Sequence, residues 1–210
     1  MRDFPLVLLT ATIWTYWIVV GVMIVRLRRR MRRNVGLVPE QRVEQYMGLI
    51  WVPLVAAWIV LPWLALTRTH APLGLPEFAR EHALYTGLRW GAAVVAMASL
   101  AATAQCWARM GKDWRMAVSV DQPTTLITDG MFGLIRHPIY AFSILLMLCT
   151  AVIVPTLPMQ VVALIHVVLM NLKARNEERH LLQTTGETYA RYLARTGRFF
   201  PRLARSPQNR

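Results

Sequence analysis

The sequence is poor in charged residues, and above all in acidic ones. Only 17% of its 210 residues are charged, with 11 aspartates and glutamates against 24 lysines and arginines. Soluble domains usually carry about 25% charged residues. Apolar residues make up 55% of the chain, and the mean hydropathy is +0.36. This composition excludes an ordinary soluble domain and indicates a membrane protein.

Cysteine is scarce as well. The sequence has only Cys106 and Cys149, so we expect neither a disulfide framework nor a metal site. It also lacks a glycine-rich cofactor fold of the soluble type and a basic surface interleaved with aromatic residues. The net charge of +13 therefore does not indicate nucleic-acid binding.

Long apolar runs are what the sequence does contain. Pro5–Val25, Met47–Leu66 and Leu88–Ala108 are almost free of charge, and each has the roughly twenty residues that a helix needs to cross a bilayer. The cluster of basic residues follows the first run, with only Arg2 before it, so we expect this run to remain as a helix and not to be cleaved as a signal peptide. These three runs predict transmembrane helices.

A further apolar region, Ile139–Leu172, is interrupted by Pro155-Thr156-Leu157-Pro158. Each half has about fifteen apolar residues, which is short for a crossing. The halves form either a hairpin of two short spans or a segment that re-enters the membrane. The sequence thus predicts an all-α integral membrane protein of about five transmembrane helices, the last two a short hairpin, followed by a cytoplasmic C-terminal helical segment.

The basic residues are unevenly placed between these spans. With the N-terminus outside, 20 of the 24 lysines and arginines fall on the cytoplasmic side, as the positive-inside rule requires. The run Arg26–Arg33 is accordingly interpreted as a topology signal that contacts anionic lipid. We expect a multi-pass protein whose active site faces the cytoplasm.

Two polar clusters flank the apolar hairpin. In the first, Thr124–Tyr140, the residues Arg136 and His137 precede Pro138, which suits the first turn of a helix. A helix N-terminus at the membrane surface favours a carboxylate or phosphate ligand, although basic residues also serve as simple interfacial anchors there. The second cluster, Lys173–His180, contains two carboxylates near the bilayer, which are costly unless they have partners or a function.

A further pattern, Gly-x-x-Tyr-x-x-Tyr, follows the second cluster. It begins at Gly186 and predicts a short amphipathic helix that lays Tyr189 and Tyr192 on the membrane or on the core. The sequence Arg198-Phe199-Phe200-Pro201 comes next. Taken together, these motifs are more specific than any one of them.

The combined order resembles the isoprenylcysteine carboxyl methyltransferase family, whose C-terminal half is similar to that of phospholipid N-methyltransferases. The likeness covers roughly Gly111–Arg202, under half of the chain. The apolar runs predict N-terminal transmembrane helices over residues 1–108, and the resemblance implies a cofactor-binding region over residues 109–210, combined with them in one membrane domain. It also implies an enzyme that moves a methyl group from S-adenosylmethionine to a lipid or prenylated acceptor.

The resemblance also implies which residues of this sequence contact the cofactor. The residues that it implies to hold S-adenosylmethionine are Thr124, Thr125, Leu126, Ile127, Phe132, His137, Pro138, Ile139, Tyr140 and Glu177. Phe132 stands where the family has tyrosine, so a hydroxyl contact is missing there.

Lys173, Arg136 and Glu178 are the candidate catalytic residues. In the family an arginine at the position of Lys173 orients an acceptor carboxylate, and lysine keeps the charge without making a bidentate contact. An amine acceptor must instead lose a proton, which Glu178 or His137 could accept. The sequence does not decide between carboxylate and amine methylation.

Two other classes of protein remain as alternatives. Membrane sterol reductases resemble this family in the same C-terminal half but use NADPH, and they usually have a different charged string where this chain has Arg175–Arg179. A membrane scaffold without catalytic activity is the second alternative.

Overall fold

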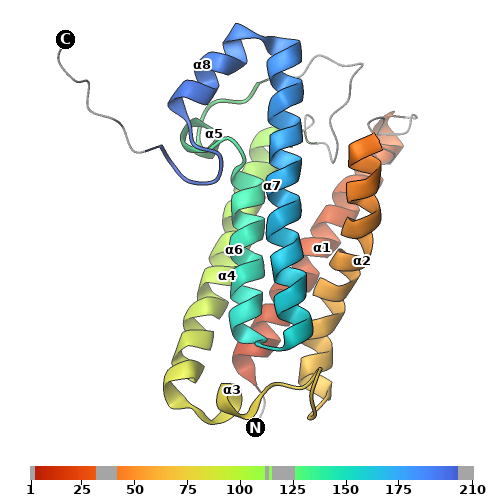
Figure 1. Ribbon diagram of the computed structural model, residues 1–210, viewed down its shortest axis with the longest axis vertical. Coiled ribbons are helices and arrows are strands. Elements are labelled where there is room, and N and C mark those ends of the chain that lie inside the picture. Colours follow the sequence, from red (N-terminus) through yellow and green to blue (C-terminus); the bar gives the residue numbers. More distant parts are fainter. Residues whose placement is uncertain (1–2, 32–41, 112–113, 115–125, 203–210) are drawn as a thin grey trace, which may run out of the picture.

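The computed structural model describes residues 3–31, 42–111, 114 and 126–202, and Figure 1 shows them as a bundle of long helices. The long helices are α1 (Phe4–Met31), α2 (Arg42–Thr67), α4 (Ala83–Met110), α6 (Pro138–Ile153) and α7 (Leu157–Thr185). The short helices are α3 (Glu77–Glu81), α5 (Met131–Leu134) and α8 (Glu187–Arg195). Within the described residues, β-type pairing is limited to one isolated bridge between Ile135 and Gly197. The predicted all-α class is confirmed.

Four of the helices are long and apolar enough to cross a membrane: Phe4–Arg29, Gln45–Thr67, Ala83–Met110 and Leu157–Thr185. They contain the three predicted N-terminal spans and the second half of the predicted hairpin. Helix α6 is a shorter apolar helix. Its 16 residues extend about 24 Å, less than a hydrocarbon core of about 30 Å. The chain is a multi-pass membrane protein.

The predicted hairpin consists of α6 and α7, which contact each other. Pro138 and Pro158 occupy the first turns of the two helices, where a missing N–H costs no intrahelical hydrogen bond. Helix α7 then runs unbroken for 29 residues. It therefore continues beyond the apolar residues into the second polar cluster, as predicted.

The helix ends sort into two groups (Figure 1). The N-terminus, α3 and the turn between α6 and α7 lie at one end of the bundle. The last turn of α1, the start of α2, the end of α4, the start of α6 and the end of α7 lie at the other, together with α5 and α8. The segments that hold most of the basic residues thus share one end, which agrees with the predicted charge separation.

At the end that carries the N-terminus, a buried arginine ties several segments together. Arg89 of α4 is 2% exposed. Its guanidinium donates hydrogen bonds to Asp3 at 2.7 Å, to the Ala79 carbonyl at 3.0 Å and to the Ile153 carbonyl at 3.1 Å. These bonds connect α4 to the start of α1, to α3 and to the end of α6. The arrangement satisfies a charge that would be expensive to bury alone.

Candidate active site

A cavity lies among the long helices on the side of α5 and α8. Its walls come from α1, α2, α4, α5, α6 and α7, and from the segments before α5 and α6. The lining residues are Tyr16, Trp17, Val20, Trp51, Trp107, Met110, Trp114, Phe132, Arg136, His137, Pro138, Ile139, Tyr140, Ser143, His166, Met170, Lys173 and Glu177. The two polar clusters that are far apart in the sequence therefore meet at one cavity.

Glu177 is the carboxylate that faces this cavity. Its side chain is 32% exposed, and its Oε2 accepts a hydrogen bond of 3.1 Å from the Tyr140 hydroxyl. The His137 ring stacks parallel to the Tyr140 ring at a centroid distance of 5.3 Å, and its Nδ1 lies 3.7 Å from Glu177 Oε2. The ammonium of Lys173 lies 5.8 Å from the centroid of the Tyr140 ring. The Glu177 carboxylate, the Lys173 ammonium and two stacked rings thus share the polar part of the cavity.

Glu178, the next residue, occupies a different environment. It is 6% exposed and does not line the cavity. Its carboxylate accepts hydrogen bonds from Arg136 at 3.0 Å and from Arg198 at 3.1 and 2.6 Å. His137 Nε2 lies 3.3 Å from the same carboxylate. Glu178 is therefore the centre of a buried ion-pair cluster behind the cavity wall.

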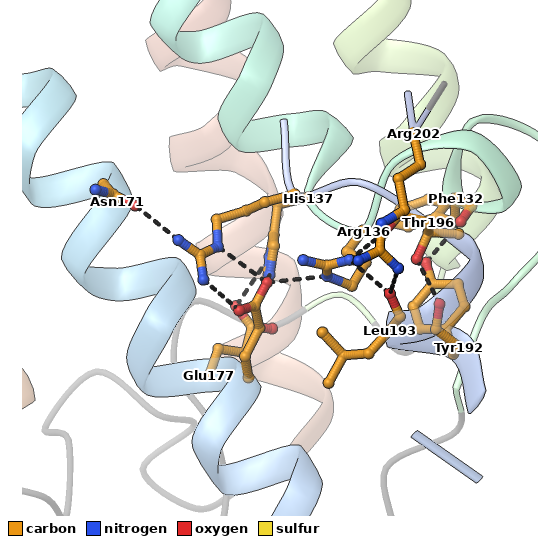
Figure 2. A network of polar contacts seen from close by, with 11 residues as sticks. Phe132, Arg136, His137, Asn171, Glu177, Tyr192, Leu193, Thr196 and Arg202 are labelled. Carbon is orange, nitrogen blue, oxygen red and sulfur yellow. Dashed lines mark hydrogen bonds and ion pairs between the residues drawn. The ribbon is translucent and has the colours of Figure 1, made fainter. Parts of the chain in front are cut away.

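The segment after α8 completes this cluster. The backbone N–H groups of Arg136 and His137 donate to the carbonyls of Gly197 and Arg198 at 2.8 and 3.1 Å. Arg198 also donates to Asn171 at 3.0 Å, and its hydrogen bonds to Glu178 raise its pKa. The side chain of Arg136 reaches the carbonyls of Leu193 and Thr196, as Figure 2 shows. The segment after α8 thereby fixes the backbone that presents Arg136 and His137.

Gly197 lies very close to the backbone of Phe200. A Cβ atom at this position would overlap the carbonyl oxygen of Phe200. The turn from Gly197 to Phe200 therefore requires a residue without a side chain, and the Gly197 backbone in this turn also pairs with Ile135.

Helix α8 holds the other side of the cavity wall. The Tyr192 hydroxyl donates a hydrogen bond of 2.6 Å to the Phe132 carbonyl. Burial raises the pKa of Tyr192 to about 12, so the hydroxyl keeps the proton that it donates. Tyr189 and Tyr192 are 1% and 4% exposed and pack with Leu181 of α7. The two tyrosines therefore pack on the protein core, which is one of the two alternatives predicted from the sequence, and not on the membrane surface.

Most of the predicted site residues meet at the cavity. Those that line it are Phe132, Arg136, His137, Pro138, Ile139, Tyr140, Lys173 and Glu177. Thr124 and Thr125 lie outside the described residues. Leu126 packs against the Leu181, Tyr189 and Tyr192 cluster, and neither Leu126 nor Ile127 is among the lining residues.

Sequence reasoning missed two groups of residues at this site. Arg198 begins the Arg-Phe-Phe-Pro sequence, to which no role is assigned from the sequence. The cost of placing two carboxylates near the bilayer nevertheless predicts that they have basic partners. The aromatic residues of α1, α2 and α4 and the polar pair Ser143 and His166 were also missed. Nothing in the sequence shows which faces of separate apolar helices will meet.

Comparison with known proteins finds a similarity over slightly less than half of the chain. Residues 87–188 match the phospholipid methyltransferase family. The match runs from α4 to the start of α8 and so includes both polar clusters. The resemblance predicted from the motifs is confirmed, and the family supports a membrane methyltransferase in general.

A curated relative is the cobalt-zinc-cadmium resistance protein CzcN of Cupriavidus metallidurans. It is 33% identical over 99 residues, which cover 46% of this chain and 45% of the relative. The chain thus matches less than half the length of this curated relative. No solved structure matches. Within the described residues, no cluster of three or more histidine, cysteine, aspartate or glutamate side chains is arranged to hold a metal ion.

Proposed function

We propose that the protein is an S-adenosylmethionine-dependent methyltransferase that acts on a lipophilic acceptor in this cavity. The observation that carries the proposal is the position of Glu177, a partly exposed carboxylate that shares one cavity with His137, Tyr140 and a lining of apolar and aromatic side chains from the membrane-spanning helices. A soluble cofactor and a lipid can meet only where a polar wall and an apolar wall border the same space.

The residues present fit the proposed cofactor. A carboxylate offers about four lone-pair sites, and Tyr140 supplies one hydrogen bond to Glu177, so Glu177 can also accept from ribose hydroxyls or an ammonium group. The rings of Phe132 and Tyr140 suit an adenine ring or a sulfonium cation. When bound, S-adenosylmethionine supplies an electrophilic methyl group and leaves as a neutral thioether.

The protein's own task is then alignment and exclusion of water. Arg136 and Glu178 form an ion pair in the buried cluster. Because Arg136 precedes His137 in the sequence, this ion pair also fixes the backbone of His137. We assign Arg136 and Glu178 to positioning the cofactor site, because the hydrogen bonds from two arginines make the Glu178 carboxylate a weak base. Lys173 lies in the cavity beside Tyr140 and is assigned to orienting the acceptor.

Two acceptor chemistries fit this assignment, and Lys173 separates them. A carboxylate acceptor is attracted by the cation, so Lys173→Arg should retain turnover and Lys173→Glu should abolish it while cofactor binding persists. An amine acceptor is repelled in its protonated form, so Lys173→Gln should leave turnover unchanged or increase it. Turnover that is the same in all three variants would remove Lys173 from the acceptor site.

We further propose that the site faces the cytoplasm, with the N-terminus outside, because the basic segments share its end of the bundle. Cysteine labelling at positions near Arg30 and Arg191 tests this topology. Both positions should react from the cytoplasmic side, and reaction from opposite sides would contradict the topology.

The cofactor proposal is tested by thermal unfolding of the detergent-purified protein with S-adenosylmethionine, S-adenosylhomocysteine or NADPH. A ligand that binds the native state raises Tm, so the first two should protect the protein and NADPH should not. Protection by NADPH alone would support a sterol-type reductase, and protection by none of the three would support a scaffold.

A further inference from the structure

The part of the cavity that lies deepest in the membrane region ends in polar side chains. His166, Ser143 and Tyr16 line it and are 1%, 5% and 5% exposed. Ser143 Oγ lies 3.1 Å from His166 Nε2, and the Tyr16 side chain lies beside Ser143 in the same lining. These three residues, here called the polar floor, connect α1, α6 and α7.

The polar floor is far from either end of α7. His166 lies nine residues after Leu157, the first residue of α7, or about 13 Å along the helix axis. Ionisable side chains at such a depth are rare because the bilayer interior does not solvate them, and they usually mark a functional site. The neighbouring ring is Trp58, at a centroid distance of 5.0 Å.

The polar floor also has hydrogen-bonding capacity that the described residues do not use. His166 Nδ1 is fully buried and has no hydrogen-bond partner among them. Nε1 of Trp17, which lines the same cavity, is likewise buried without a partner among the described side chains. Buried polar groups are almost always paired with protein, water or a ligand.

One face of α7 joins the polar floor to the proposed reaction site. His166, Met170, Lys173 and Glu177 all line the cavity, and their spacing of three and four residues places them on the same side of a helix. Lys173 is seven residues from His166, a rise of about 10 Å. An acceptor whose reacting group lies near Lys173 therefore reaches the polar floor with a part of its body about 10 Å away.

We infer that the polar floor is a subsite that binds a hydroxyl group on the lipophilic acceptor. This inference rests on the proposed function. A hydroxyl satisfies His166 Nδ1 in either ring tautomer, because it can donate to the bare nitrogen or accept from the N–H. The subsite selects lipids that carry such a group within their apolar body over plain hydrocarbon chains.

The test uses two probes of equal chain length, 1-octanol and 1-fluorooctane, and the full chain purified in detergent without cofactor. Fluorine is a very weak hydrogen-bonding group, so the pair isolates the hydroxyl. Tryptophan fluorescence reports binding, since Trp17, Trp51 and Trp107 line the cavity. We expect 1-octanol to bind about tenfold more tightly, the effect of one hydrogen bond.

Two variants assign this preference to the polar floor. His166→Phe keeps a ring of similar size and should remove the preference, and Ser143→Ala should reduce it by releasing the imidazole. The matched control is His180→Phe, which replaces a second buried histidine of the same helix outside the cavity lining, and it should keep the wild-type preference. If His166→Phe fails to fold, the preference for 1-octanol in the wild-type protein and its reduction in Ser143→Ala still test the subsite.

Equal affinities for the two probes in the wild-type protein, or a preference that survives in His166→Phe, would overturn the subsite. S-adenosylhomocysteine binding is measured on the same samples. Its absence in the wild-type protein would overturn the proposed function, whereas equal probe affinities with intact S-adenosylhomocysteine binding would overturn the subsite alone.

Discussion

Both ends of the helical bundle bury an arginine–carboxylate ion pair, but the two pairs differ in their surroundings. At the end with the N-terminus, Arg89 pairs with Asp3 and also donates to two backbone carbonyls, and it does not line the cavity. At the other end, Glu178 pairs with Arg136 and Arg198 directly behind the cavity wall. A buried ion pair alone therefore does not identify a site. The cavity and the partly exposed Glu177 beside the second pair make the difference.

The largest effect on stability is expected for the Arg89 cluster. Arg89→Ala removes three hydrogen bonds and leaves two carbonyls and Asp3 without their partner, and breaking a buried pair costs about 3 to 5 kcal/mol. Thermal unfolding in detergent should show a large fall in Tm, while the S-adenosylhomocysteine affinity of the folded fraction stays unchanged. Arg68→Ala, at an exposed arginine of the same end, is the control and should leave Tm unchanged. Weaker S-adenosylhomocysteine binding by the folded Arg89→Ala protein would contradict the proposed difference between the two ends.

A smaller loss of stability, with an added loss of binding, is expected at the other ion pair. Glu178→Gln leaves Arg136 and Arg198 without their shared negative charge and should cost about 2 to 3 kcal/mol, because hydrogen bonds to charged groups are the strong ones. The backbone of His137 is fixed by the same segment, so S-adenosylhomocysteine should also bind more weakly. Thermal unfolding and a ligand titration on the same sample measure both effects. Wild-type affinity together with reduced Tm would reduce Glu178 to a purely structural role.

The smallest effect is expected for Tyr192, which holds the cavity wall without any charge. Tyr192→Phe removes the hydrogen bond to the Phe132 carbonyl and should cost about 1 kcal/mol at neutral pH.

The pKa of Tyr192 also predicts how stability depends on pH. Because it is raised from its ordinary value of 10 to about 12, the tyrosine ionises first in the unfolded state. Stability from this group is complete below pH 10 and is lost as the pH rises towards 12. Between pH 8 and 12, the Tm of Tyr192→Phe should therefore fall less steeply with pH than the Tm of the wild-type protein. Identical slopes for the two proteins would contradict this role of Tyr192.

The sequence contained enough information for the helices and for much of the candidate site. Apolar runs of membrane length predict α1, α2 and α4, and Pro138 marks the start of α6. The motifs around His137 and Glu177 lie at the two ends of one helical hairpin, so local rules bring them together.

Other parts of the site depend on contacts that no local pattern records. Leu126 packs on α7 and α8 although the family resemblance places it with the cofactor contacts. Glu177 and Glu178 are neighbours in the sequence, and only the rotation of α7 against its partners determines which one faces the cavity. His166 and Ser143 sit within apolar runs, and the sequence alone does not show that α6 and α7 turn them toward each other.

Glu177 has the central role in the proposed site, as the cavity carboxylate that binds the cofactor. Calorimetric titration of S-adenosylhomocysteine into the wild-type protein, Glu177→Gln and the control Glu81→Gln, at an exposed glutamate of the opposite end, tests this role. The wild-type protein and the control should bind equally well, while Glu177→Gln should bind at least about tenfold more weakly, as expected for loss of a hydrogen bond to a charged group. Its Tm should remain close to that of the wild-type protein, because Glu177 lies outside the buried ion-pair cluster. Equal affinity in all three proteins would contradict the assignment of this cavity to the cofactor.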